Sequence, residues 1–256
     1  MHRTRKRFGQ HFLHDQNTIL RILRAIDPQP GDNLVEIGPG EGALTLPLLR
    51  ACQNLTAIEL DRDLLAPLQR RASPIGRLEI INADILEFDL ESLPMEGPLR
   101  LVGNLPYNIS TPLMFHLLDS VTRIRDMHFM LQKEVAQRIV AAPGDRHYGR
   151  LSVMLQYRCE CQYLFEVAPE CFRPPPKVDS AVIRLLPLAA PAYDIGDYAT
   201  FSSIVQTAFG QRRKTIANSL KGLLSRQLIA DCGIDPGLRA ENLALADFAS
   251  LSRACA

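Results

Sequence analysis

The sequence Gly103-Asn104-Leu105-Pro106-Tyr107-Asn108-Ile109-Ser110-Thr111-Pro112 connects a predicted strand to a predicted helix. The apolar run over residues 98–102 is typical of a short buried strand, and the run over residues 113–118 is typical of a helix. Thr111 is a suitable N-cap for that helix, and Pro112 is a suitable first helical residue. We therefore expect residues 104–107 on a strand-to-helix turn, where an open α/β sheet binds its ligands.

The side chains of this turn are suited to holding the amino group of a planar heterocycle. Asn104 has an amide oxygen, and the carbonyl of Leu105 is a second acceptor. Pro106 rigidifies the loop, and Tyr107 offers a flat face on which a ring can stack. The exocyclic amine of adenine matches this set of groups. The alternative is an ordinary turn that happens to contain an asparagine and a tyrosine.

A glycine-rich loop opens the same predicted sheet. Residues 33–37 are typical of a strand, and Gly38 and Gly40 follow, so that the backbone can turn tightly and approach a ligand. The spacing Gly38-x-Gly40-x-x-Ala43, with Glu59 about twenty residues further on, also satisfies the NAD-binding pattern. Glu36 distinguishes the two interpretations, because it places a carboxylate where a dinucleotide site usually has an apolar residue.

Acidic side chains stand at the ends of three successive predicted strands. Glu36 precedes the glycine loop, and Glu59 ends the strand over residues 55–59, where it can accept both hydroxyls of a ribose. Asp84 follows the strand over residues 77–81 and can accept the amino group of an adenine. The resulting acidic crevice favours a cationic ligand over a pyrophosphate, which it would repel. A solvated strand-end acid is the alternative for Glu59.

The composition predicts a soluble globular protein. A chain of 256 residues accommodates one large domain, or one with a small appendage, and a net charge of +1 indicates no preference for nucleic acid by itself. The six cysteines contain no C-x-x-C pair, so we expect reduced thiols, a cytoplasmic location and no metal site. We find neither a signal peptide nor an apolar run long enough to cross a bilayer.

The chain divides into an α/β part and a helical part. Residues 15–26 carry apolar side chains at helical spacing, and residues 188–192 mark a change in composition, beyond which only helices are expected, over residues 200–209 and 213–224. The fold class is therefore α/β, with a Rossmann-like sheet and a small all-α C-terminal domain. We predict a catalytic domain over residues 1–188, with a basic N-terminal arm, and a helical RNA-binding or ribosome-binding domain over residues 193–256.

Basic and aromatic side chains provide candidate RNA contacts. Phe172 precedes three prolines that stiffen the chain, so we expect an exposed ring that faces Tyr107 across a target base. The alternative is a core residue beneath a proline turn. Candidate phosphate contacts, for which a solvated surface is the ordinary alternative, are Arg5, Lys6, Arg7, Lys177, Arg212, Arg213, Lys214 and Lys221.

These motifs together resemble those of the S-adenosylmethionine-dependent N6-adenine methyltransferases. The resemblance is carried by Glu36-Ile37-Gly38-Pro39-Gly40, Glu59, Asp84 and Asn104-Leu105-Pro106-Tyr107. Nearly the full chain is similar to the bacterial small-subunit ribosomal RNA dimethyladenosine transferases, through the segments over residues 8–13, 131–134, 148–152, 172–180 and 211–215.

The resemblance implies a class I methyltransferase fold with S-adenosylmethionine as cofactor. It implies as target two adjacent adenosines in the 3′-terminal hairpin of 16S rRNA, within an immature small ribosomal subunit, and we expect a monomer without membrane association. Transfer would involve residues 104–107 and Phe172. The cofactor would contact His11, Leu13, Glu36, Gly38, Gly40, Glu59, Asp84 and Asn104. His11 departs from the pattern, because the family typically has asparagine there.

Two functions from other classes stay open at this point. An NAD-dependent oxidoreductase is supported by the glycine spacing alone. A non-catalytic ribosome-assembly or RNA-binding factor would share the fold, but the intact motif over residues 104–107 favours chemistry. Among enzymes, a methylase of large-subunit RNA shares the core motif, whereas residues 172–180 and the C-terminal helices favour a small-subunit enzyme.

Overall fold

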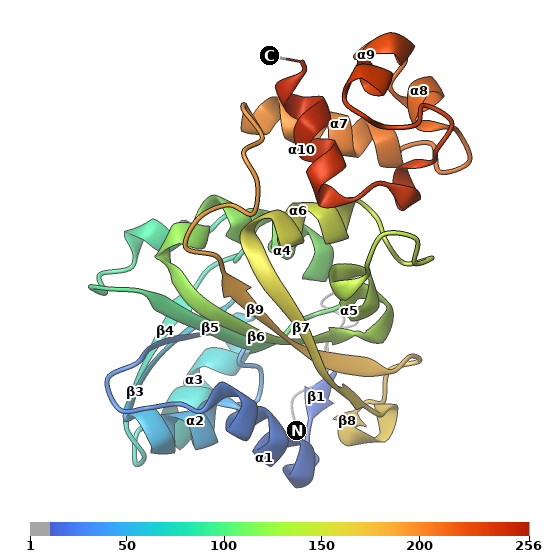
Figure 1. Ribbon diagram of the computed structural model, residues 1–256. Helices are drawn as coiled ribbons and strands as arrows, with labels where there is room; N and C mark the ends of the chain where they lie inside the picture. Colours follow the sequence, from blue (N-terminus) through green and yellow to red (C-terminus); the bar gives the residue numbers. More distant parts are fainter. Residues whose placement is uncertain (1–10, 256) are drawn as a thin grey trace. The chain divides into compact units, whose positions relative to one another are not determined.

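The central feature of the computed structural model, which describes residues 11–255, is a seven-stranded sheet (Figure 1). Its strand order is β4-β3-β2-β5-β6-β9-β7. The strands are β2 (Asn33–Ile37), β3 (Asn54–Glu59), β4 (Arg77–Asn82), β5 (Leu99–Asn104), β6 (Ile124–Gln132), β7 (Cys159–Val167) and β9 (Ser180–Pro187). The five strands from β4 to β6 are parallel to their neighbours, whereas β9 is antiparallel to β6.

The strand order reverses direction between β2 and β5. From β2 the chain moves outward to β3 and β4, and it then returns to pair β5 with the other edge of β2. The loops that leave β2 and β5 therefore diverge, and a crevice opens at the carboxyl ends of these strands. Gly103 allows the close pairing there, because a Cβ atom on it would lie 2.5 Å from the carbonyl oxygen of Ile37.

Helices cover both faces of this sheet. Helices α1 (Gln16–Ile26), α2 (Thr45–Cys52) and α3 (Arg62–Ala72) lie on one face, and α4 (Ser110–Asp119) lies on the other (Figure 1). Helix α1 begins where the sequence predicts, because the side chain of Asp15 accepts a hydrogen bond from the backbone N–H of Thr18 at 2.7 Å. A cap of this type stabilises a helix by about 1 kcal/mol.

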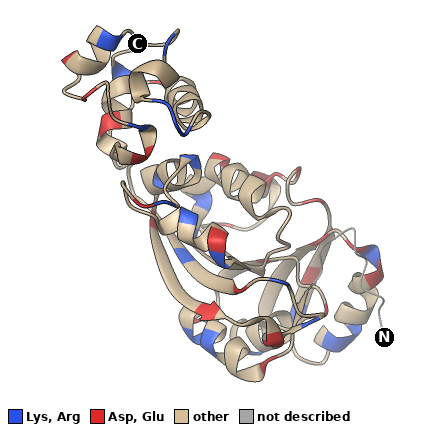
Figure 2. Ribbon diagram, turned by 90° about the vertical axis from the view of Figure 1, so that its right-hand side faces the viewer, with Lys and Arg blue, Asp and Glu red and all other residues tan. Residues whose placement is uncertain are grey.

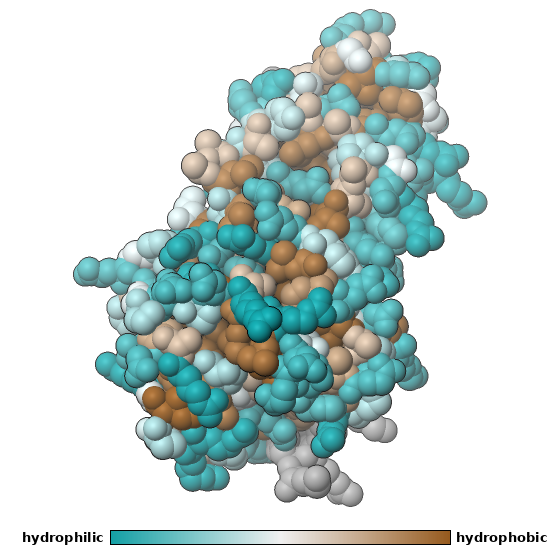
Figure 3. Space-filling model, turned by 60° about the horizontal axis from the view of Figure 1, so that its bottom comes forward, coloured by the Kyte–Doolittle hydropathy of each residue, from teal (hydrophilic) through white to brown (hydrophobic). Residues whose placement is uncertain are grey.

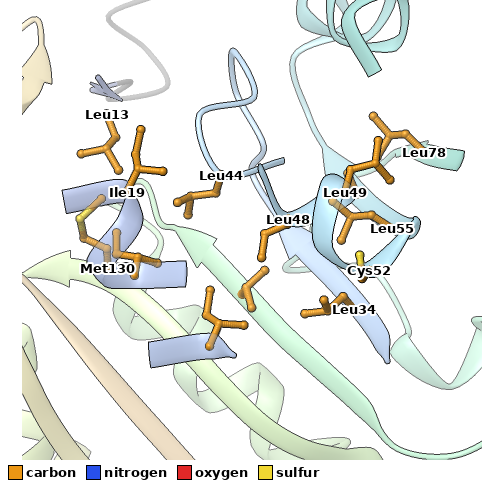
Figure 4. Close-up of a cluster of buried hydrophobic side chains, with 14 of the residues drawn as sticks. Leu13, Ile19, Leu34, Leu44, Leu48, Leu49, Cys52, Leu55, Leu78 and Met130 are labelled. Atoms are coloured by element: carbon orange, nitrogen blue, oxygen red, sulfur yellow. The ribbon is translucent and has the colours of Figure 1, made fainter. Parts of the chain in front are cut away.

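Apolar side chains from the sheet and from the first helices form a core cluster. Figure 4 shows Leu34 of β2 and Leu55 of β3 in the same cluster as Leu48 and Leu49 of α2. These leucines are at most 3% exposed. The spacing of apolar residues in the sequence thus determines which faces of the helices pack on the sheet.

The start of the described chain is held by a second, small sheet. Strand β1 (Phe12–Leu13) pairs antiparallel with β8 (Phe172–Arg173), so that Leu13 lies opposite Phe172. The sequence analysis did not foresee this pairing. It fixes the end of the N-terminal arm against the segment that contains the three prolines.

The chain separates into two compact units. The first contains the residues up to Ala136 together with Gln162–Pro187, and the second contains Gln137–Cys161 and the chain from Leu188 on. Helix α5 (Lys133–Val140) continues from the first unit into the second, which also contains α6 (Arg150–Arg158), α7 (Tyr198–Phe209), α8 (Ile216–Ser219), α9 (Arg226–Asp231) and α10 (Leu245–Arg253). The division into domains over residues 1–188 and 193–256 stays a prediction.

Two helix boundaries differ from the predictions. The helix expected over residues 213–224 is only the four residues of α8, followed by turns in which Gly222 has a φ of +114°. Helix α4 begins at Ser110 rather than at Pro112, so Thr111 is not its N-cap. Hydrophilic side chains surround smaller apolar areas on the surface drawn in Figure 3, as expected where the amphipathic elements bury their apolar sides.

Candidate functional site

A pocket in the first unit lies at the carboxyl ends of β2, β3 and β5. Its lining contains all of the predicted cofactor residues together with the turn over residues 104–107. The predicted lining residues are His11, Leu13, Glu36, Gly38, Gly40, Glu59, Asp84, Asn104, Leu105, Pro106 and Tyr107. The structure therefore brings together motifs that are distributed over almost one hundred residues of sequence.

The glycine loop and the N-terminal arm form one wall of this pocket. Gly38 and Gly40 have φ angles of +67° and +57°, a conformation that L side chains rarely adopt. A Cβ atom on Gly40 would lie 3.1 Å from Cε1 of Phe12, so a larger residue would also push against the arm. The loop thus requires glycine both for its backbone angles and for the close approach of Phe12.

Glu36 is a buried acid without a charged partner among residues 11–255. Its side chain is 1% exposed, and its Oε2 atom has no hydrogen-bond partner within the part of the chain that the structure describes. Loss of hydration raises the pKa of Glu36 to about 8, and the nearby charge of Glu59 acts in the same direction. A cationic ligand in the pocket would remove this penalty.

Glu59 is held in a fixed orientation by backbone amides. Its Oε2 atom accepts a hydrogen bond from the N–H of Gly40 at 3.1 Å, and its Oε1 atom accepts one from the N–H of Asp61 at 2.8 Å. Burial nevertheless raises the pKa of Glu59, because desolvation outweighs these two hydrogen bonds. Each carboxylate oxygen keeps a second lone pair, which can accept from a ligand hydroxyl.

Asp84 and several apolar side chains complete the inner wall. Asp84 accepts a hydrogen bond from the N–H of Leu86 at 2.9 Å through Oδ1, which positions the carboxylate at the end of β4. The apolar lining also contains five residues that no sequence motif named: Leu44, Ile58, Leu60, Ala83 and Ile85. These residues stand within a few positions of the motif residues in the sequence. This proximity could have been used to predict them as pocket residues.

The turn after β5 is held by contacts on several sides. The Nδ2 atom of Asn104 donates to the backbone carbonyl of His11 at 3.0 Å. The hydroxyl of Tyr107 is hydrogen-bonded to that of the buried Ser180 at 2.7 Å, and its ring stacks on the ring of His11 with centroids 5.5 Å apart. The carbonyl of Pro106 is occupied by the N–H of Ile109 and the hydroxyl of Ser110.

The prediction of an exposed Phe172 is wrong. Its side chain is 2% exposed and belongs to the core cluster, because the pairing of β8 with β1 turns it towards Leu13 and the interior. It does not line the pocket. The aromatic ring that lies against Tyr107 is that of His11.

The five predicted phosphate contacts that the structure describes do not line the pocket. Arg5, Lys6 and Arg7 lie outside the described residues. Lys177 is exposed in the first unit, between β8 and β9, and Arg212, Arg213, Lys214 and Lys221 are exposed in turns of the second unit. Figure 2 shows lysine and arginine positions on the loops of this second unit. Arg212 also donates to the carbonyl of Arg146 at 2.9 Å.

The donor and acceptor set of the pocket fits S-adenosylmethionine. The buried, unpartnered Oε2 atom of Glu36 fits a ligand with a positive charge, and Glu59 and Asp84 fit a ribose and an amino-substituted base. A parallel sheet with such a pocket at its switch point, beside an Asn-Leu-Pro-Tyr turn, defines a Rossmann-like methyltransferase.

Comparisons with known proteins show to which family of methyltransferases the chain belongs. The family described as ribosomal RNA adenine dimethylase matches residues 1–256. The chain is 58% identical to ribosomal RNA small subunit methyltransferase A of Methylococcus capsulatus over 98% of both chains. It is 55% identical to the protein of that name from Xylella fastidiosa, over 98% of this chain and 95% of the relative.

Solved structures agree with this similarity. A dimethyladenosine transferase from Plasmodium falciparum superimposes with a TM-score of 0.81 at 25% identity, over 94% of this chain and 96% of that one. The 23S rRNA methyltransferase ErmE superimposes with a TM-score of 0.74 at 28% identity, over 95% and 98%. The chain belongs to the ribosomal RNA adenine dimethylase family, whose methyl donor is S-adenosylmethionine.

Membership of this family excludes the interpretation as an NAD-dependent oxidoreductase, which was supported by the glycine spacing alone. Within residues 11–255, no helix combines the length and the apolar character needed to span a bilayer.

Proposed function

We propose that this protein transfers methyl groups from S-adenosylmethionine to N6 of two adjacent adenosines in the 3′-terminal hairpin of 16S rRNA, giving N6,N6-dimethyladenosines. The observation that carries the proposal is the Asn104 amide at a pocket with two buried acids, Glu36 and Glu59. An amide acceptor beside a site for a cationic donor is the arrangement that methylation of an exocyclic amine requires.

Four groups of the pocket would hold the cofactor. S-adenosylmethionine, when bound, supplies an electrophilic methyl group. Glu59 would accept the ribose hydroxyls, and Asp84 would accept the amino group of the adenine ring of the cofactor. Glu36 would become charged opposite the positive end of the ligand. The apolar walls would exclude water around the reacting atoms.

Asn104 and Leu105 would prepare the target nitrogen. The lone pair of an adenine amino group is delocalised into the ring, so the nitrogen is a poor nucleophile. Oδ1 of Asn104 and the carbonyl of Leu105 would accept its two N–H groups and favour a pyramidal nitrogen. The nitrogen held in this way would accept the methyl group as the donor sulfur leaves as a neutral thioether, and it would lose one proton to solvent once the transfer is complete. These acceptors and the face of Tyr107 stabilise the positive charge that develops.

The second methylation has a different hydrogen-bond requirement. The monomethylated amine has only one N–H group, so one of the two acceptors loses its donor in the second round. The site must still align the nitrogen with the methyl group, and this alignment supplies much of the rate. Asn104 therefore cannot act as a two-proton clamp throughout the reaction.

The exposed basic residues would bind RNA outside the pocket. Lys177, Arg212, Arg213, Lys214 and Lys221 would contact phosphates, and we extend this proposal to Arg5, Lys6 and Arg7. We further propose that a monomer acts in the cytoplasm on the immature small subunit, because these residues are too few to specify a sequence by themselves. The assembled subunit would then present the two adenosines.

Labelled cofactor tests this function on two substrates. The purified protein is incubated with naked 16S rRNA or with small subunits that lack the marks, and modified adenosines are mapped by mass. We expect two adjacent dimethylated adenosines in the 3′-terminal hairpin of the subunits and much weaker labelling of naked RNA. Equal labelling of both substrates would contradict the requirement for the particle. Labelling at another position or on another base would contradict the assigned reaction.

A further inference from the structure

His11 of the N-terminal arm contacts two residues of the turn over residues 104–107. Its backbone carbonyl accepts the hydrogen bond from Nδ2 of Asn104 at 3.0 Å, and its ring stacks on Tyr107. Its Nδ1 atom lies 2.7 Å from the carbonyl oxygen of Pro174. His11 therefore connects the turn after β5 with the proline segment after β8.

The contact with the His11 carbonyl determines which way the Asn104 amide faces. An asparagine amide has an acceptor on one side and a double donor on the other. The carbonyl of His11 can only accept, so the NH2 group of Asn104 must face it, and a flipped amide would set two oxygens against each other. Oδ1 of Asn104 consequently faces away from the arm.

The side chain of His11 holds that carbonyl in place. The carbonyl of Pro174 is also only an acceptor, so the hydrogen bond requires a proton on Nδ1 of His11. The adjoining Phe12 and Leu13 pair with β8, and the hydroxyl of Tyr107 is held by Ser180. His11 is thus fixed between two segments that the sheet itself positions.

We propose that His11 is a positioning residue for methyl transfer, whose tether to Pro174 keeps Oδ1 of Asn104 presented to the target amine. This role rests on the proposed function and adds to it. It differs from a cofactor contact, because it predicts an effect on the transfer step rather than on cofactor affinity. Asparagine at this position would also have an N–H donor, on the side-chain atom attached to Cγ, and would preserve the tether.

Three variants separate the contributions of the ring and of its donor. His11→Ala removes both, His11→Phe keeps a ring without a donor, and His11→Asn keeps a donor without a ring. We expect kcat on small subunits to fall about 10–100-fold in His11→Ala and His11→Phe, as for loss of a positioning hydrogen bond. His11→Asn should lower kcat less than His11→Phe does, and in His11→Ala and His11→Phe the loss of affinity for S-adenosylmethionine should be much smaller than the loss of kcat.

Combining the His11 variants with Asn104→Ala tests whether His11 affects methyl transfer through Asn104. Because His11 acts through Asn104, His11→Ala should reduce kcat far less in the Asn104→Ala background than in wild type. Equal reductions in both backgrounds would overturn the proposal. A loss of cofactor affinity as large as the loss of kcat, or an unchanged kcat in His11→Ala, would also overturn it.

A measurement without turnover separates this proposal from the proposed function. NMR correlation of the histidine ring nitrogens, assigned by loss of the signal in His11→Asn, reports the tautomer of His11. We expect the proton on Nδ1 in the neutral ring, and a proton on Nε2 alone would overturn the tether. If the wild type methylated no adenosine, the proposed function would fail, while this result would still decide whether the tether exists.

Discussion

The two ends of the parallel sheet bury charged side chains in opposite ways. At the carboxyl ends, Glu36 and Glu59 lie near each other without a cationic partner among residues 11–255, and burial raises the pKa of both. At the amino end, Arg100 of β5 contacts Asp126 of β6 at 3.0 Å and Asp32 at 2.5 Å. One end contains acids that lack a counter-charge, and the other contains a paired cluster.

The difference identifies the end of the sheet that is available to a ligand. Burial alone would raise the pKa of Asp126, but the contact with His128 and the hydrogen bonds from Arg100 lower it. Its charge is therefore already compensated within the protein, and a ligand would gain little there. At Glu36 the compensation is missing, so a bound cation can supply it. Buried acids without a counter-charge therefore identify the ligand pocket, whereas the buried acids paired with Arg100 have a structural role.

Breaking the paired cluster should have the largest effect on stability. Arg100→Met leaves Asp126 and Asp32 buried with less compensation, and we expect the free energy of unfolding to fall by about 3–5 kcal/mol. Chemical denaturation measures this change, and activity per folded molecule should be retained. The matched control is Arg125→Met, whose side chain is 59% exposed beside Asp32 and should contribute less than about 1 kcal/mol. Equal destabilisation by both variants would contradict the comparison.

Removing the Asn104 amide at the carboxyl end of β5 should lower the rate of methyl transfer rather than the stability of the protein. We expect Asn104→Ala to reduce kcat about 10²–10³-fold, as for loss of a preorganised polar group, with cofactor affinity largely intact. Single-turnover labelling and calorimetry measure the two quantities. The control is Asn54→Ala at the amino end of β3, where the side chain is exposed and the kinetics should not change. A large loss of cofactor affinity in Asn104→Ala would refute the assignment.

Glu59→Ala should weaken cofactor binding more than it lowers kcat, the reverse of what is expected for Asn104→Ala. We expect the Kd for S-adenosylmethionine to rise about 10–100-fold, because the ribose loses charge-assisted hydrogen bonds. The loss of kcat at saturating cofactor should be smaller. Glu79→Ala, an exposed acid on the neighbouring β4, is the control and should leave the affinity unchanged in calorimetry. An unchanged affinity in Glu59→Ala would show that this carboxylate does not hold the ligand.

The smallest predicted effect is a dependence of cofactor affinity on pH. With its pKa raised to about 8, Glu36 is neutral at lower pH and must lose a proton to face a cation. Affinity should therefore rise by up to about tenfold per pH unit as the pH approaches about 8. In Glu36→Gln this dependence should be absent, with the affinity close to the low-pH value of the wild type. The same slope in wild type and variant would exclude Glu36 as its source.

The raised pKa of Glu36 also makes the stability of the protein depend on pH. The pKa of Glu36 is higher in the folded protein than its ordinary value of 4.5, so the folded state binds more protons between these values. The contribution of Glu36 to stability is therefore greatest at low pH and is lost as the pH rises from 4.5 towards about 8. Glu36→Gln should remove this part of the pH dependence in denaturation experiments.

Local patterns in the sequence were sufficient to predict the sheet and most of the pocket. Glu36, Glu59 and Asp84 each stand where an apolar run ends, and parallel strands place such ends at one edge of the sheet. Asp15 and Asp61 cap α1 and α3, and such caps can be found in a sequence because capping involves residues only two or three positions apart. The prediction of a helix over residues 213–224 was wrong, since helical spacing alone did not reveal the turn at Gly222.

Only the tertiary structure decided how the distant segments meet. The hydrogen bond from His11 to Pro174 joins residues 163 positions apart, and that from Asn104 to His11 spans 93 positions. Phe172 became a core residue because β8 pairs with β1, and no periodicity in either two-residue strand records that pairing. The sequence determined the order of strands, turns and acids, because these depend on neighbouring residues. The folded chain decided which side chains face the ligand, because that depends on contacts with no local signal.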